Sequence, residues 1–461
     1  MLAISGASFA AGYGVSQYWR TNQIDNIING EEWRNDRKIN EKDLRNLDSD
    51  ETVLSEAKKL IQQHRRGDFK LQLQMSDGSP FSNQVLQLKQ ISHEVDWGCS
   101  AAGSALLLIK DENHQEMSRN FAELFNCTTA KCYWEERWHQ PIERYRERRV
   151  YDKFLDEVKW SESLGIKVKG HPLVWTVPKA IPKWVHDYPY EQQLQFLKRH
   201  VQSMIEAAGP SVQLWDLCNE MLWEPAFKNI AKREWPHIDP IEDIAEYIAF
   251  ALEWAREINP EATYSLNDYG LVHTYRQEIS AGDQRQRYLK LVEALRVKGQ
   301  VPDAIGCQTH VGGNFRLAAF KRTLQELAQS NLPLQVTEFW AKEKGFPQGL
   351  SPDELEQQIA DYICQMYTVG FAEPLLSHFT YWGNRVFFDK QGQPKLAYKK
   401  LHQLIKNDWS TKTELQTNEN GQLTFSGFKG SYTILQSGQK EALAVVDLYQ
   451  SNSDFEKVIV N

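Results

Sequence analysis

Several features that would assign this chain to a class are scarce or missing. Lys and Arg number 53 against 61 Asp and Glu, for a net charge of −8. No positive surplus is present to neutralise a phosphate backbone, so no nucleic-acid partner is expected. After the N-terminal segment 1–20, no uncharged run approaches the roughly 18 residues of a membrane span. Zinc-type spacings and a phosphate-cradling glycine loop are also missing, so we expect neither a metal nor a cofactor.

Cysteine is sparse for a chain of 461 residues. The six are Cys99, Cys127, Cys132, Cys218, Cys307 and Cys364. Cys127 and Cys132 are near enough in sequence to bridge a loop in an oxidising compartment, and two free thiols are the alternative. The redox compartment therefore stays open.

The N-terminal segment, residues 1–20, is rich in small apolar residues but lacks the positive start of a signal peptide. We interpret it as an incomplete signal and expect an extracytoplasmic or secreted protein, with a loosely anchored terminus as the alternative. Residues 21–66 are polar and are interpreted as a tether that contains a short helix over Glu51–Gln63.

Two flanking segments, residues 67–94 and 409–461, show the alternation of β-strands. Strands are predicted at Phe69–Met75, Val85–Ile91, Gln422–Phe425, Tyr432–Leu435 and Ala442–Val446. Because two-stranded fragments are marginal alone, we expect the flanks to pair into one small accessory β-sandwich-like domain.

Between the flanks, residues 95–408 alternate strand-like and helix-like runs. The eight predicted strands are Asp96–Ala101, Leu124–Thr129, Lys167–Val174, Gln213–Cys218, Thr263–Asn267, Asp303–Thr309, Leu334–Thr337 and Leu376–Tyr381. Helices are predicted in the gaps, for example at Val150–Leu164, Glu191–Ala208, Pro240–Ile258 and Asp353–Val369. This repeat predicts an α/β fold, the (β/α)8 TIM barrel, whose catalytic groups lie at the C-terminal ends of the strands.

Those strand ends are rich in carboxylates, amides, histidines and tryptophans. They carry Lys131, Trp134, His171, Trp175, Asn219, Glu220, Trp223, Asn267, Asp268, Tyr269, Gln308, His310, Glu338, Trp340, Trp382 and Asn384. Aromatic rings stack on the apolar face of a sugar, and amides and histidines suit its hydroxyl rim. The combination indicates a carbohydrate site.

Each residue also has a structural interpretation when it is taken alone. A tryptophan beside a strand usually packs in the core. His171 alone is more often a hydrogen-bonded structural histidine, and the Asn219-Glu220 pair is as compatible with a salt bridge to a neighbouring helix. Packing gives no reason to gather two carboxylates, two histidines and several tryptophans on one rim, so the joint placement favours a site.

Glu220 and Glu338 each close an apolar strand, where burying an unpaired carboxylate is costly. Two such acids predict the hydrolysis of a glycosidic bond. In a retaining enzyme, two carboxyl groups about 5–5.5 Å apart act as acid/base and nucleophile.

Five strand ends resemble the motifs of glycoside hydrolase family 10, which contains endo-β-1,4-xylanases. They are Gly170-His171-Pro172-Leu173-Val174-Trp175, Trp215-Asp216-Leu217-Cys218-Asn219-Glu220, Gln308-Thr309-His310, Val336-Thr337-Glu338 and Tyr381-Trp382-Gly383. The resemblance covers roughly residues 95–405. It implies that Glu220 is the general acid/base and Glu338 the nucleophile of a retaining mechanism.

The same resemblance implies roles for the residues around the two acids. Asn219 would bind the sugar 2-hydroxyl, and His310 would orient Glu338 and keep it ionised. The other predicted substrate-binding residues are Lys131, Trp134, His171, Trp175, Asn267, Tyr269, Gln308, Trp340 and Trp382.

The chain departs from the family pattern at several rim positions. Lys131-Cys132 replaces the Glu-Asn that grips the next sugar toward the non-reducing end, and Glu135 stands where the family has a lysine. Thr176 replaces a second histidine, and Trp340 replaces an aspartate that supports the strand-six histidine. The loop after Trp382 is short and lacks a second tryptophan. These changes predict an intact catalytic pair with rebuilt glycone recognition.

We therefore expect a retaining hydrolase that cleaves internal β-1,4 linkages of xylan or a related plant-type β-glycan. Its expected partner is a polysaccharide or oligosaccharide, and the chain is expected to be a monomer. The alternatives are a hydrolase with shifted β-glycan specificity, a non-catalytic carbohydrate-binding barrel, and a scaffold that binds another protein.

Overall fold

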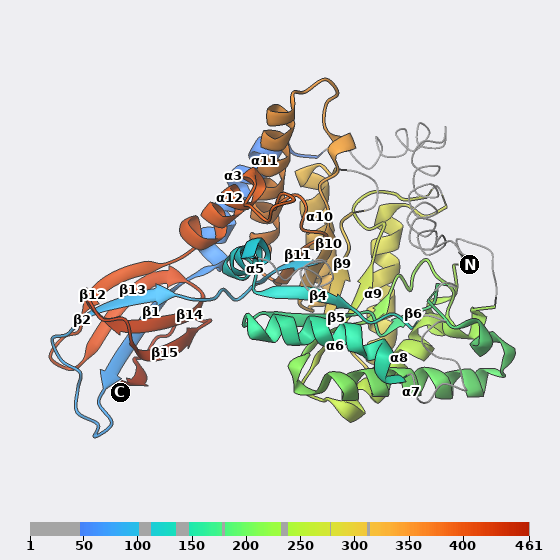
Figure 1. Ribbon diagram of the computed structural model, residues 1–461, viewed down its shortest axis with the longest axis horizontal. Helices are drawn as coiled ribbons and strands as arrows, with labels where there is room; N and C mark the ends of the chain where they lie inside the picture. The colour runs from blue at the N-terminus through green and yellow to red at the C-terminus, as the bar shows by residue number, and fades with distance from the viewer. Residues whose placement is uncertain are drawn as a thin grey trace, which may run out of the picture.

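The computed structural model describes residues 47–100, 112–134, 147–177, 180–231, 238–276, 278–310 and 314–460. The predicted N-terminal segment 1–20 and most of the predicted tether lie outside these residues, as does Glu135. Figure 1 shows a large strand-and-helix body with a smaller β-domain projecting from one side, near the C-terminus.

The larger body is a closed barrel of eight parallel strand positions. Its strands are β3 (Asp96–Ser100), β4 (Cys127–Lys131), β5 (Lys167–His171), β6 (Val174–Trp175), β7 (Leu214–Asn219), β8 (Thr263–Asp268), β9 (Ala304–Cys307), β10 (Leu334–Phe339) and β11 (Leu376–Tyr381). They follow the order β5-β4-β3-β11-β10-β9-β8-β7-β6, and the β5–β7 pairing closes the ring. The predicted (β/α)8 barrel is confirmed.

Two predicted strands differ from those observed, for local reasons. The predicted strand Lys167–Val174 is split into β5 and β6 around Pro172, because proline has no N–H to donate to a sheet. The predicted start of β4 at Leu124 is wrong, since Leu124 ends the preceding helix. Leu124 and Phe125 are both buried, and a buried apolar pair looks the same in a helix and in a strand.

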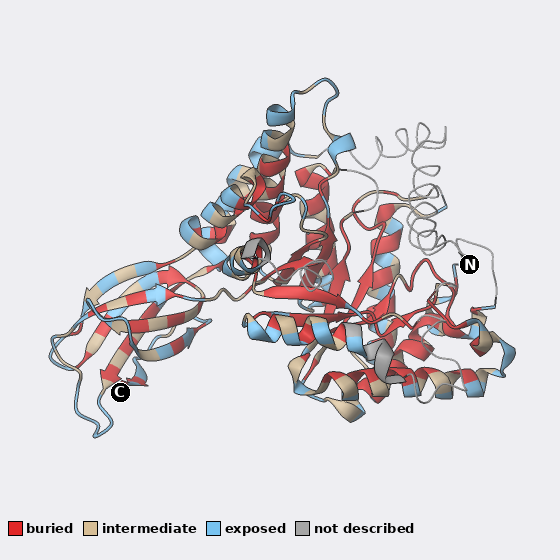
Figure 2. Cartoon of the chain, viewed as in Figure 1, coloured by how far each residue is buried: buried red, intermediate tan, exposed pale blue. Residues whose placement is uncertain are grey.

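Helices surround the barrel and bury one face against the strands (Figure 2). They are α5 (Glu112–Leu124), α6 (Glu147–Ser163), α7 (Tyr190–Ala208), α8 (Ile241–Ile258), α9 (Ala281–Val297), α10 (Leu317–Leu327), α11 (Pro352–Phe371) and α12 (Leu396–Gln403). α11 shows how the sequence fixes a start. The Ser351 side chain accepts from the N–H of Glu354, whose side chain accepts from the N–H of Ser351, and Pro352 takes the first turn.

The smaller domain is built from both flanks of the barrel, as predicted. Its strands are β1 (Arg66–Gln74), β2 (Val85–Gln90), β12 (Lys412–Gln416), β13 (Gln422–Phe428), β14 (Gly430–Gln436), β15 (Ala442–Leu448) and β16 (Glu456–Ile459). One sheet has the order β13-β1-β16 and the other β12-β2-β14-β15. The alternating apolar residues Phe69, Leu71, Leu86 and Leu88 share one buried core. β12 and β16 are additional to the predicted strands.

Arg65 makes several polar contacts where the smaller domain joins the barrel. Its side chain is 2% exposed. Its Nε donates to the carbonyl of Phe371 at 2.8 Å, Nη2 donates to the carbonyl of Leu376 at 3.1 Å, and Nη1 pairs with Glu94 at 2.9 Å. The guanidinium also lies 4.9 Å from the centre of the Phe371 ring. One side chain just before β1 thus holds the end of α11 and the start of β11.

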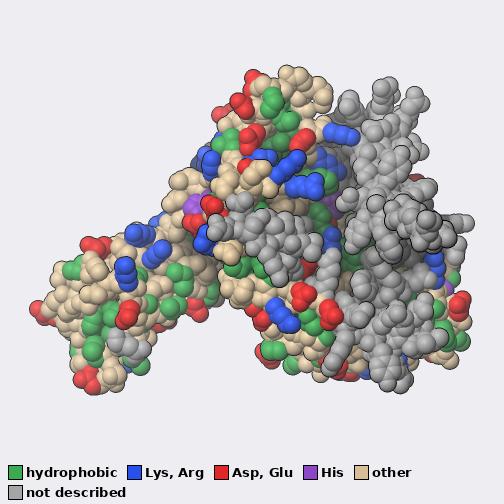
Figure 3. All heavy atoms as spheres, in the orientation of Figure 1, with side chains coloured by type: hydrophobic (Ala, Val, Ile, Leu, Met, Phe, Trp, Pro, Cys, Tyr) green, Lys and Arg blue, Asp and Glu red, His purple; other side chains and the backbone are tan. Residues whose placement is uncertain are grey.

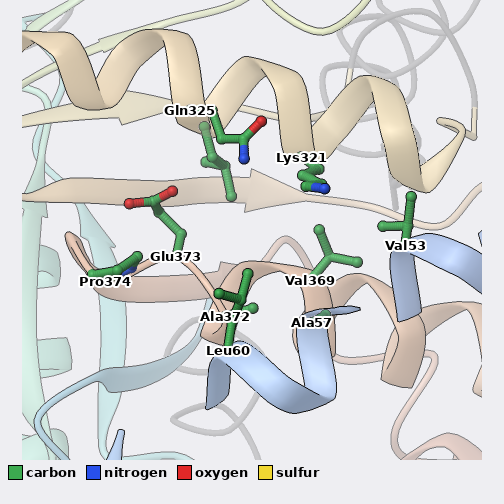
Figure 4. A pocket seen from close by; sticks show the side chains of 10 residues that line it. Val53, Ala57, Leu60, Lys321, Gln325, Val369, Ala372, Glu373 and Pro374 are labelled. Atoms are coloured by element: carbon green, nitrogen blue, oxygen red, sulfur yellow. The ribbon is translucent and has the colours of Figure 1, made fainter. Parts of the chain in front are cut away.

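The predicted helix before the first flank strand is present as α3 (Asp50–His64), with Ser49 as its N-cap. It lies against α10 and α11. Val53, Ala57 and Leu60 of α3 line a hollow of about 170 Å³ between these helices (Figure 4). The hollow contains neither Glu220 nor Glu338 in its wall.

The visible surface carries acidic, basic and hydrophobic side chains together (Figure 3). Within the described ranges, every helix is too short or too polar to cross a membrane. All six cysteines are free. Cys127 and Cys132 are buried, and burial raises the pKa of both thiols. Of the two alternatives for this pair, the structure contains the free thiols.

Candidate active site

Glu220 follows β7 in an unusual backbone conformation. The pairing of β7 with β8 shifts register between Asp216 and Cys218, and Glu220 has a φ of 59°. A non-glycine residue in this left-handed region is strained, and such strain collects at functional sites. The N–H of Glu220 donates to the carbonyl of Asn267 at 2.8 Å, which holds the turn in place.

The half-buried carboxylate of Glu220 accepts two side-chain hydrogen bonds. The indole N–H of Trp175, on β6, donates to Oε2 at 2.9 Å. The amide of Gln308, just after β9, donates to Oε1 at 3.2 Å. Strands on both sides of β7 therefore orient this acid.

Glu338 lies near the end of β10 and is more deeply buried, with 6% exposure. The pairing of β10 with β11 shifts register between Val336 and Phe339, an irregularity of the kind that re-aims side chains beside active sites. Oε1 of Glu338 accepts from the amide of Asn267 at 2.9 Å. Oε2 lies 3.3 Å from Nε2 of His310, and Nε2 of His171 lies 3.9 Å from Oε1.

A continuous set of amide hydrogen bonds connects the two acids. Gln308 donates to Glu220 and also to Oδ1 of Asn219 at 3.2 Å. Asn267 donates to the same Oδ1 at 2.9 Å and to Glu338. Thr337 donates to Oδ1 of Asn267 at 2.5 Å, which turns the Asn267 NH₂ group toward Glu338. Glu220 and Glu338 thus belong to one hydrogen-bonded cluster at one end of the barrel.

The surroundings of Glu338 favour its charged form. Burial by itself raises the pKa of this carboxyl, but the hydrogen bond from His310 and the charges of His310 and His171 outweigh burial. The net result is a pKa below the ordinary glutamate value. Glu338 is therefore ionised at neutral pH.

Beneath Glu338 lies a buried ion pair that the sequence prediction missed. Lys169 of β5 contacts Asp216 of β7 at 2.6 Å, with 2% and 1% side-chain exposure. Asp216 also accepts from Ser265 at 2.8 Å and lies 2.8 Å from Nδ1 of His171. Burial raises the pKa of Asp216, but the charge of Lys169 and the hydrogen bond from His171 hold it well below its ordinary value. A charged Asp216 fixes the His171 ring.

Aromatic rings form the wall beside the acids. Tyr133 lies 5.4 Å from Trp175 and 6.1 Å from His171, between ring centres. Trp382 meets His171 edge-on at 5.6 Å. The ammonium of Lys131 lies 5.4 Å from the Trp382 ring and 5.9 Å from the Tyr133 ring. Tyr133, absent from the predicted set, is therefore part of this wall, and its sequence signal was its place between Lys131 and Trp134.

Other predicted aromatic residues are buried against neighbouring rings. Trp134 is 4% exposed and stacks on His200 at 4.9 Å. Trp223 is fully buried and stacks on Tyr269 at 5.6 Å. These rings are packed against other side chains, and their contact with a sugar stays a prediction.

Trp340 has the opposite environment. It is 46% exposed, and the ammonium of Lys342 lies 5.6 Å from its ring. Trp340 stands where the family resemblance predicts an aspartate, and an indole cannot offer His310 a carboxylate. Nε2 of His310 instead lies 2.8 Å from Oε1 of Gln308.

Asp268, another predicted strand-end residue, is fully buried. Its carboxylate accepts from the backbone N–H groups of Leu222 at 2.8 Å and Tyr269 at 2.7 Å, and burial raises its pKa.

The family model for glycosyl hydrolase family 10 matches residues 100–404, from the end of β3 through α12. The chain belongs to that family. Family 10 membership explains why the acids, amides and histidines of the cluster come from consecutive strand ends in the predicted order.

The chain is similar to curated proteins of two different descriptions. The chain is 25% identical over 353 residues to endo-1,4-beta-xylanase B of Thermotoga neapolitana, covering 71% of this chain and 94% of that protein. It is 24% identical over 396 residues to anti-sigma-I factor RsgI6 of Acetivibrio thermocellus, covering 83% of this chain and 46% of that protein. The chain thus spans nearly all of one relative and about half of the other.

Solved structures show the same fold. Xylanase 10B from Thermotoga petrophila RKU-1 in complex with xylobiose aligns with a TM-score of 0.54 and 22% identity, over 68% of this chain and 95% of that one. A family 10 protein from Paenibacillus barcinonensis aligns with a TM-score of 0.53 and 24% identity, again over 68% and 95%.

Proposed function

We propose that this chain is a retaining glycoside hydrolase that cleaves internal β-1,4 linkages of xylan or a related β-glycan. The observation that carries the proposal is the cluster joining Glu220 and Glu338. It holds one acid half-buried beneath an indole and the other buried, ionised and flanked by two histidines. Two carboxyl groups in contrasting environments are what a double displacement requires.

In the first step, the Glu338 carboxylate attacks the anomeric carbon as the bond to the leaving oxygen breaks. Glu220 donates its proton to that oxygen. In the second step, Glu220 takes a proton from water, and the resulting hydroxide equivalent displaces Glu338 from the anomeric carbon. Both carboxyl groups return to their starting state, and the product keeps the β-configuration.

The residues around the acids have roles that follow from their contacts. Asn219 is placed by Asn267 and Gln308 and is the candidate partner of the sugar 2-hydroxyl. His310 keeps Glu338 ionised. Trp382 and Tyr133 offer ring faces for a sugar beside the acids. Action on a polymer also fits a location outside the cytoplasm, which we propose with the activity.

The test is to incubate the full chain with xylan, mixed-linkage glucan and aryl β-glycosides and to measure released reducing ends. We expect xylan to be cleaved in mid-chain, with a rapid fall in viscosity. Proton NMR of the first product should show the β-anomer. If none of the three substrates is cleaved, the proposal is wrong.

A second candidate is a carbohydrate-binding barrel without turnover. The observation in its favour is the similarity to an anti-sigma-I factor, which extends over 83% of this chain, together with the altered rim at Lys131 and Trp340. Calorimetric binding of xylo-oligosaccharides by a chain that releases no reducing ends would favour this second function.

A further inference from the structure

The last residue of β4 places a positive charge on the aromatic wall of the site. Lys131 is exposed, and its ammonium lies over two rings, Trp382 at 5.4 Å and Tyr133 at 5.9 Å. An ammonium within about 6 Å of a ring centre is attracted to the ring's negative face. The cation is therefore held at this wall and does not simply extend into water.

Each of the two rings contacts a side chain that lies beside one of the two acids. Trp382 meets His171, which lies 3.9 Å from Glu338. Tyr133 meets Trp175, which donates to Glu220. Two side chains thus separate Lys131 from each acid, which places its ammonium beside a sugar unit near the cleaved linkage and not at the linkage itself.

The charge at this position selects a chemical class of ligand. An ammonium donates three hydrogen bonds and accepts none, so a protein contact still leaves donors for a ligand. A bond from an ammonium to a carboxylate is roughly twice as strong as one between neutral groups. In a chain of net charge −8, such a cation beside two sugar-stacking rings favours a sugar that carries a carboxylate.

We propose that Lys131, with the Trp382 and Tyr133 rings, forms a subsite for a uronic acid unit of the β-glycan. The sugar face packs on the rings while its carboxylate binds the ammonium. This inference rests on the proposed function for the location of the cleaved linkage. It assigns this protein a preference for acidic, uronic-acid-bearing β-glycans over neutral ones.

Binding separates this proposal from catalysis. The Glu338→Gln chain is titrated calorimetrically with two xylo-oligosaccharides of equal length, one neutral and one carrying a single glucuronic acid. The acidic ligand is expected to bind about tenfold more tightly at low salt. The preference should shrink in 0.5 M NaCl, to about twofold or less, because exposed charges are screened.

Lys131→Met keeps the apolar stem and removes the charge, so it should abolish the preference in the same titrations, and Lys131→Glu should reverse it. The matched control, Lys290→Met, removes an exposed lysine from the outer helix α9 and should leave the preference intact. Equal affinities of the parent chain for the two ligands would overturn the uronic acid subsite, as would a preference that survives Lys131→Met. Neither result bears on whether wild-type protein cleaves xylan, which the reducing-end assay measures separately.

Discussion

The floor and the rim of this site are built in different ways. The floor consists of Lys169, Asp216, Asn267 and Glu338, which are at most 6% exposed and each make at least two polar contacts. The rim consists of Lys131, Tyr133, Trp340 and Trp382, which are half-buried or exposed and are held largely by ring contacts.

The difference explains where the chain departs from its family. A change in the floor that removes one partner of a buried pair, without an isosteric group to replace it, costs several kcal/mol. A change in the rim leaves polar groups exposed to solvent, where water can replace the lost hydrogen bonds. The departures expected from the family resemblance at Lys131 and Trp340 both lie on the rim. Selection on substrate can thus act on the rim without loss of the fold.

The largest effect is expected from Glu338→Gln. Without the ionised oxygen, no covalent intermediate forms, and kcat on xylan should fall by more than about 10³-fold. The melting temperature should fall by only a few degrees, because the amide oxygen can still accept from Asn267. Glu343→Gln, an exposed carboxylate after the same strand, is the control and should retain full kcat. A loss of folding in Glu338→Gln would mean that the floor residue serves packing instead of chemistry.

Glu220→Ala should have the next largest effect, and one that depends on the substrate. Removing the proton donor should lower kcat on xylan by about 10²–10⁴-fold. Aryl glycosides with very acidic phenols need little protonation, so their glycosylation rate should be much less affected. Pre-steady-state release of the phenol measures this step. Equal losses on both substrates would contradict the acid role.

Lys169→Met tests the floor through stability. It leaves the buried charge of Asp216 without its cation, so the free energy of unfolding should fall by about 3–5 kcal/mol. Lys167→Met is a matched control two residues away. The Lys167 side chain is 60% exposed and pairs with Asp96 at 2.8 Å, and an exposed pair contributes about 0–1 kcal/mol. Urea unfolding measures both, and equal losses would remove the contrast between buried and exposed pairs.

The same variant has a defined pH dependence. The folded-state pKa of Asp216 is depressed. Its charge therefore stabilises the fold above the unfolded-state pKa of about 3.9, and that stabilisation is lost as the pH falls toward the folded value. Burial raises the pKa of Asp216 and Lys169 is the main group that lowers it, so Asp216 should protonate at a higher pH in Lys169→Met than in wild type. The stability difference between the two proteins should therefore shrink as the pH falls, and urea unfolding at a series of pH values measures it.

The smallest effect is expected in the pH profile of kcat/KM, on the limb where activity falls at low pH. Because the pKa of Glu338 is lowered, this limb should lie below the ordinary glutamate value of about 4.3. His310→Ala removes the hydrogen bond and charge that lower it, so the limb should move up by about one pH unit. His402→Ala, which removes an outer histidine paired with Glu123 at 3.1 Å, should leave the limb in place. An unchanged limb in His310→Ala would show that His310 does not set the charge of Glu338.

The barrel was predictable because short strand-like runs alternate with helix-like runs eight times along the chain. Glu220 and Glu338 were found because they interrupt such runs at the strand ends. The pairing of Lys169 with Asp216 was not predictable, since it depends on β5 lying beside β7 in the closed ring. Alternation along β5 does place Lys169 on the same face as His171, and that was the available signal.

Two further features could not be predicted from the residues around them in the sequence. β12 is a short, mostly polar strand, Lys412–Gln416, which is held by its pairing with β2 and by the packing of Leu415 on the core of the small domain. The left-handed backbone of Glu220 and Thr309 is imposed by surrounding contacts on residues that ordinarily avoid it. Tertiary structure determines both features.

The central position of β1, between β13 and β16, has a consequence for biosynthesis. Ribosomes add about 5–20 residues per second, so β1 emerges well before either of its partners exists. Until the last strands are translated, its edges are open to pairing with other chains. Production of this protein should accordingly be sensitive to C-terminal truncation and to chaperone supply, even where every residue of the barrel is intact.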